Sequence, residues 1–116
     1  MNDQQESGAG TGEGAARMDC QWYALHDWMP PRPPRLRVTG TCVMPTPGYT
    51  LTLTRAQPQG INPDILELEL SVTPPDGVAA TVLTPAEVEY YEETTHHYRQ
   101  VHIRPDGFLV DVESAS

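Results

Sequence analysis

The sequence contains no lysine, and its seven basic residues, all arginines, stand against sixteen aspartates and glutamates. The formal net charge is therefore −9 at pH 7. A domain of this sign is repelled by phosphate groups, which argues against a nucleic-acid partner and against anionic membrane surfaces. The absence of lysine beside many Ala, Gly, Pro and Arg residues is typical of a high-GC coding sequence, so we expect a bacterial protein.

Long apolar runs are also missing, since none approaches the roughly 18 residues of a membrane-spanning helix. The N-terminus lacks the basic and apolar regions of a signal peptide, so the sequence predicts a small, soluble, cytoplasmic protein. Cysteine is scarce, and Cys20 and Cys42 lie outside any CxxC spacing. A disulfide between them would need an oxidising compartment, and we expect two reduced thiols.

Motifs of catalysis are absent as well. The sequence has no GxSxG, HExxH, phosphate-binding-loop or GxGxxG pattern. Cys42 falls on the inward face of a predicted strand, where a thiol is usually inert. We therefore expect a protein that is not an enzyme and holds no cofactor.

Domain organisation follows from composition. Residues 1–17 are mostly Gly, Ser, Gln, Glu, Asp, Thr and Ala without apolar periodicity, and they cannot bury enough surface to offset their ordering entropy. The sequence therefore predicts a disordered tail over 1–17, a single domain over 18–113 and a frayed C-terminus over 114–116.

The clearest element is the stretch Ile65–Val72, in which apolar and polar residues alternate. This period of two predicts a strand with one face in a core. Similar stretches predict further strands, and Asp106-Gly107 predicts a hairpin turn between the last two. The stretches flanking Pro45–Gly48 predict another antiparallel hairpin. The other expected strands cover 19–29, 36–44, 49–54, 78–83, 98–104 and 108–113.

One segment has two interpretations. Thr84, Pro85 and Glu87 could form the capping box of a helix over 85–94. A strand would instead turn Val88 and Tyr90 inward, and we favour the strand. The sequence as a whole predicts an all-β protein: an antiparallel two-layer sandwich of about seven strands, immunoglobulin-like in size.

Two features point to a binding function. Trp22 and Trp28 could form an exposed stacking platform, although large aromatics near a terminus usually cover a core. Pro30, Pro33 and Arg35 form a PxxPxR pattern of the kind that proline-binding domains accept, although we favour a stiff connector between two strands as its explanation. We therefore expect a monomeric, non-catalytic module that binds another protein.

The alternative function is weak binding of a metal or small ligand. Glu92, His96, His97 and His102 are the ligand types that Zn²⁺ accepts. In an extended chain, however, His96 and His97 point to opposite sides. A solvated loop between two strands explains these residues without a site.

Overall fold

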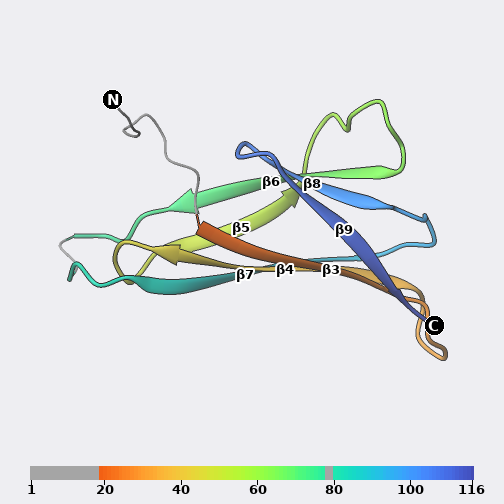
Figure 1. Cartoon of the computed structure of the whole chain (residues 1–116), viewed down its shortest axis with the longest axis horizontal. Coiled ribbons are helices and arrows are strands. Elements are labelled where there is room, and N and C mark those ends of the chain that lie inside the picture. The colour runs from red at the N-terminus through yellow and green to blue at the C-terminus, as the bar shows by residue number, and fades with distance from the viewer. Residues whose placement is uncertain (1–18, 78–79) are drawn as a thin grey trace, which may run out of the picture.

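The computed structural model describes residues 19–77 and 80–116 (Figure 1). This part of the chain contains strands and no helix, as the all-β prediction expects. The predicted tail over 1–17 and the start of the predicted strand 78–83 lie outside the described residues. The strands are β3 (Asp19–Asp27), β4 (Arg35–Met44), β5 (Thr50–Arg55), β6 (Ile65–Thr73), β7 (Thr84–Glu93), β8 (Gln100–Arg104) and β9 (Phe108–Ala115).

All seven strands belong to one mixed sheet, in the order β5-β6-β8-β9-β3-β4-β7. The pairs β3–β9 and β6–β8 are parallel, and the other four pairs are antiparallel. The sheet curls until its two edge strands, β5 and β7, contact each other, so the fold is close to a barrel. The predicted antiparallel two-layer sandwich is therefore wrong, because alternation of side chains defines the faces of a strand and not the direction of its neighbours.

The last strand holds the curled sheet together. Residues 108–111 of β9 pair with β8, and residues 112–115 of the same strand pair with β3. The hairpin predicted at Asp106-Gly107 is confirmed, with Gly107 at a φ of 87°. Pairing continues through Ala115, beyond the residue at which we expected the strand to end.

Two other local predictions are wrong. β4 and β5 do not pair across Pro45–Gly48, because both edges of β4 are already occupied by β3 and β7. Residues 80–83 are not a strand; they lead without regular structure into β7. The strand interpretation of 85–94 is confirmed, with Val88 buried and Tyr90 half-buried.

The core lies inside the curl and follows the predicted alternation. Leu66, Leu68 and Leu70 of β6 are buried, whereas Val72 is partly exposed where the strand passes beyond the core. The fully buried apolar side chains come from β3, β4, β6 and β8. They are Ala24, Leu36, Val38, Cys42, Leu66, Leu68, Val101 and Ile103.

Trp22 fills one end of this core from β3. It stands opposite Gly40 of β4, and a Cβ at Gly40 would overlap the six-membered ring of the indole. The glycine therefore makes room for the tryptophan.

Cys20 and Cys42 are bonded to each other, so the expectation of two reduced thiols is wrong. The two residues are direct partners in the β3–β4 ladder, which brings them together despite a separation of 22 residues. The disulfide ties the first half of β3 to β4.

We predict that Gly40→Ala lowers the free energy of unfolding by about 1–3 kcal/mol, because the added methyl group displaces the Trp22 indole. Urea unfolding measures the change. Gly60→Ala is the matched control, since its Cβ would come no closer than 3.2 Å to the Glu67 side chain, whereas a Cβ at Gly40 would overlap the indole. Equal stability of the Gly40 variant and the wild type would contradict the packing described.

We predict that the double variant Cys20→Ala, Cys42→Ala is less stable than the oxidised protein by about 2–4 kcal/mol, because the bridge restricts the unfolded chain. Urea unfolding of both forms gives the difference. Thiol titration of the unfolded, unreduced wild type supplies the control. Two reactive thiols there would show that the bridge does not form.

Candidate functional site

A groove of about 420 Å³ opens between β3 and β9. It exists because the ladder of these strands covers only Ala24–Asp27 and Val112–Ala115, and before those residues the strands diverge (Figure 1). The first half of β9 then follows β8, and the first half of β3 follows β4. The groove is lined by Trp22, Tyr23, Phe108, Leu109, Val110, Asp111 and Glu113.

The β3 wall presents backbone groups to the groove. The N–H of Trp28 donates to the carbonyl of Ala115 at 2.8 Å, so the even-numbered residues of β3 face β9. The Cα atoms of Cys20 and Cys42 lie 4.0 Å apart, the short spacing of an antiparallel pair that exchanges no backbone hydrogen bonds. In such a pair the backbone groups of each residue point away from the other strand. Cys20 and Trp22 therefore direct their N–H and C=O groups into the groove, where no described strand pairs with them.

The opposite wall, formed by β9, presents the backbone groups of Leu109 to the groove. The N–H of Val112 donates to the carbonyl of Arg99 at 3.0 Å, which marks the side of β9 that faces β8. Alternation along the strand then turns the backbone of Leu109 away from β8 and toward the groove. Two sheet edges thus face one another across the opening.

Trp22 adds a side-chain donor. Its Nε1 is buried and has no hydrogen-bond partner within residues 19–77 and 80–116. The opposite edge of the indole lies on Gly40, so Nε1 points away from β4, and the ring packs against Phe108 with centroids 5.7 Å apart. A buried donor left unpaired costs about 1–3 kcal/mol, so the indole is held here by its packing and not by a hydrogen bond.

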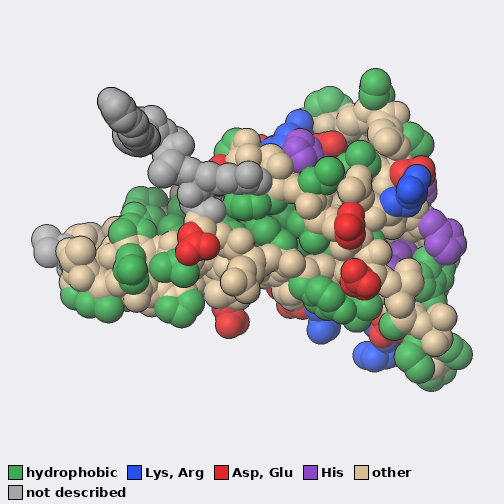
Figure 2. All heavy atoms as spheres, in the orientation of Figure 1, with side chains coloured by type: hydrophobic (Ala, Val, Ile, Leu, Met, Phe, Trp, Pro, Cys, Tyr) green, Lys and Arg blue, Asp and Glu red, His purple; other side chains and the backbone are tan. Residues whose placement is uncertain are grey.

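The rim of the groove combines apolar and acidic groups. Tyr23 and Leu109 are 52% and 56% exposed on its two sides. The charged residues that line it are Asp111 and Glu113, and no arginine does so. Figure 2 shows hydrophobic side chains gathered in the middle of this face with acidic groups around them. The groove therefore combines aromatic and aliphatic side chains with open backbone groups and a negative edge.

Trp28, the second predicted tryptophan, lies at the far end of β3. Its ring stacks between those of His26 and His97, with centroid distances of 4.1 and 4.3 Å. His26 is buried, and its Nε2 lies 2.9 Å from the carbonyl of Thr94. The stack covers this end of the core and does not meet Trp22.

The proline segment forms the turn from β3 to β4. Arg35 is buried, forms an ion pair with Asp27 and donates to the carbonyl of Pro33 at 2.9 Å. Asp27 also accepts the N–H of Met29 at 3.0 Å. Pro30 is exposed, but the arginine of the PxxPxR pattern is held within the turn. This arrangement matches the connector interpretation.

The four candidate metal ligands do not converge. Glu92 accepts hydrogen bonds from Arg55 and Tyr90, and His96 Nε2 lies 2.7 Å from the carbonyl of Pro63. No group of three metal-ligating side chains comes together among the described residues. The other two candidates have different neighbours: His97 stacks on Trp28, and His102 Nδ1 lies 2.7 Å from Glu67.

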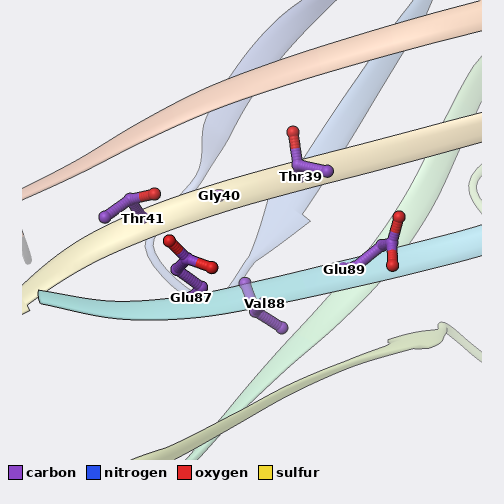
Figure 3. A pocket seen from close by; sticks show the side chains of 6 residues that line it. All are labelled: Thr39, Gly40, Thr41, Glu87, Val88 and Glu89. Carbon is purple, nitrogen blue, oxygen red and sulfur yellow. The ribbon is translucent and has the colours of Figure 1, made fainter.

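A shallow hollow on the outer face lies between β4 and β7 (Figure 3). Thr39 and Thr41 point outward from β4, and Glu87 and Glu89 extend from β7 (Figure 3). Glu89 pairs with the exposed Arg37 at 2.7 Å. The hollow brings carboxylates and hydroxyls together without a histidine or thiol to activate them.

Sequence reasoning named Trp22 but missed the groove. Tyr23, Leu109 and Glu113 carried no motif, since a groove between diverging strands depends on which strands are neighbours. Comparisons with protein-family models, with curated proteins and with solved structures find no match to this chain. No described helix is long and apolar enough to cross a membrane.

The seam between the edge strands holds a polar network. Arg55 of β5 contacts Glu92 of β7 at 3.1 Å and donates to the hydroxyl of Tyr98 at 3.2 Å. The hydroxyl of Tyr90 donates to Glu92 at 2.6 Å. Burial, followed by this hydrogen bond to the carboxylate, raises the pKa of Tyr90 to about 12.

We predict a loss of stability in alkali that depends on Tyr90. Its pKa is higher in the folded chain than its ordinary value of 10.0, so the stabilisation is complete below pH 10 and is lost as the pH rises toward 12. Unfolding measured across this interval should show a smaller loss in Tyr90→Phe. Tyr23→Phe is the control and should retain the wild-type profile; identical profiles for all three proteins would refute the assignment.

Proposed function

We propose that this protein is a small, non-catalytic binding module that accepts an extended segment of another protein in the groove between β3 and β9. The observation that carries the proposal is the pair of open sheet edges. Cys20 and Trp22 direct backbone donors and acceptors into the groove from one side, and Leu109 does so from the other. A peptide that adds to a sheet edge gains main-chain hydrogen bonds of this kind.

The length and shape of the groove support a short segment. The open part of β3 is Asp19–Tyr23, which at about 3.3 Å per residue accommodates roughly five residues of an added strand. Every second side chain of such a strand would turn toward Trp22 and Phe108. Aliphatic side chains at those positions would pack on these two rings, while the backbone of the added strand would bond to the open edges.

The charges support a basic segment. Asp111 and Glu113 line the groove, Asp19 stands at the start of β3, and the chain as a whole carries −9. Cationic side chains that point away from the floor would lie near these carboxylates. An attractive net charge also raises the rate of encounter at low salt.

The partners of the histidine rings support a non-catalytic function. Among the described residues, no serine, threonine or cysteine side chain bonds to a histidine ring, as nucleophilic catalysis would need. The contact between His102 and Glu67 joins neighbouring strands on the outer face.

The test is a titration of the full chain with the capped peptide Arg-Val-Arg-Val-Arg, followed by nuclear magnetic resonance. We expect the indole N–H of Trp22 and the amides of Cys20 and Leu109 to shift on binding. The capped peptide Glu-Val-Glu-Val-Glu should bind more weakly because of charge. The capped peptide Arg-Pro-Arg-Pro-Arg should bind more weakly because proline cannot donate to a strand.

A matched pair of variants locates the site. Leu109→Arg should weaken binding at least about tenfold, or 1.4 kcal/mol, because it removes an apolar wall and repels the basic peptide. Val82→Arg is the control, since Val82 is 57% exposed and does not line the groove. Shifts confined to other residues, or a dimer of the chain formed through the same edge, would contradict the proposal.

A further inference from the structure

A second hollow, of about 100 Å³, lies at the opposite end of β3. It is on the outer face of the sheet, beside the turn from β3 to β4. Three of the seven arginines of this lysine-free chain line it: Arg32, Arg35 and Arg37. Leu25, Asp27 and Tyr91 complete the wall. This gathering of guanidinium groups stands out in a protein with a net charge of −9.

Two of the guanidinium groups are held in place. Arg35 is buried and is bound by the Asp27 carboxylate and the carbonyl of Pro33. Arg37 is bound through its Nε, which lies 2.7 Å from the Glu89 carboxylate. Its two terminal amino groups have no partner among the described residues, so a positioned pair of donors is available.

The third guanidinium supplies further hydrogen-bond donors. Arg32 projects from the proline segment and has no ion-pair partner in the described part of the chain. Asp27 and Glu89 pair with Arg35 and Arg37. Glu93 and Glu113, the ladder partners of Arg35 and Leu25, also stand on this face, so the hollow offers free guanidinium donors without an excess of positive charge. Glu93 lies nearby, where it accepts the hydroxyl of Tyr91 at 3.3 Å, but it does not line the hollow.

We propose that this hollow, which we call the arginine niche, binds a carboxylate group. A guanidinium fork matches the geometry of a carboxylate with two parallel hydrogen bonds, which Arg37 is positioned to donate. Arg32 closes over the bound group from the proline segment. Leu25 and Tyr91 provide an apolar wall for the methylene groups that carry the carboxylate, and a volume of about 100 Å³ admits a group of that size.

The inference goes beyond the proposed function. The niche presents guanidinium donors, whereas the groove is lined by carboxylates and no arginine, and the two lie toward opposite ends of β3. The two surfaces therefore bind different groups. The carboxylate can belong to the side chain of a protein or to a small free acid. The chemistry of recognition is the same for both, and the experiment separates them.

The test uses the full chain and three small probes followed by calorimetry or nuclear magnetic resonance: N-acetyl-glutamate amide, glutarate and N-acetyl-glutamine amide. We expect the two acids to bind with millimolar dissociation constants and to shift the resonances of Leu25 and Tyr91. Tighter binding of the capped glutamate identifies a protein side chain as the source, and tighter binding of glutarate identifies a free acid. Equal binding of the glutamine probe would overturn the proposal, as would tighter binding of inorganic phosphate.

Variants distinguish the niche from general charge effects. Arg32→Gln and the pair Arg37→Gln, Glu89→Gln should each weaken carboxylate binding about tenfold, since each removes charged donors without leaving a carboxylate unpaired. Arg99→Gln removes one charge elsewhere on the surface and should have no effect. Leu109→Arg, which blocks the groove, should also leave binding unchanged. An equal loss in Arg99→Gln would show that only net charge matters and would refute the niche.

Discussion

The structure depends on one strand that pairs with different neighbours along its length. β9 pairs with β8 through residues 108–111 and with β3 through residues 112–115. This change of partner joins the two halves of the sheet and brings the edge strands β5 and β7 into contact. It also forces β3 and β9 apart over their first halves. The same constraint therefore produces the enclosed core and the open groove.

The strands themselves could be predicted from the sequence, whereas their neighbours could not. Alternation in 65–72, 36–44 and 108–113 reports which side chains are buried, and the buried leucines of β6 agree with it. Nothing in that pattern distinguishes parallel from antiparallel pairing, so the sandwich prediction failed at β3–β9 and β6–β8. The disulfide was missed for the same reason, since its formation depends on the register of β3 with β4.

In the candidate sites, too, some residues could be recognised from the sequence, whereas their spatial neighbours could not. Trp22 and Arg35 are recognisable from the sequence as unusual residues, but the structure gives each a role that depends on its neighbours. Trp22 forms the floor of a groove, and Arg35 holds a turn and lines the arginine niche. Leu109 and Arg37 belong to the same two surfaces and carried no sequence signal. The histidines were gathered by sequence and separated by the fold, because His96, His97 and His102 face different partners.

The disulfide has a consequence for the groove that concerns entropy. Cys20 lies in the half of β3 whose edge toward β9 is open, and its bond to Cys42 fastens that half to β4. A sheet edge without a neighbour on one side would otherwise fray, and a partner would have to order it on binding. A wall that is covalently fastened before the encounter removes that ordering cost from the binding free energy. The crosslink therefore acts as pre-organisation of a recognition edge as well as a brace for the fold.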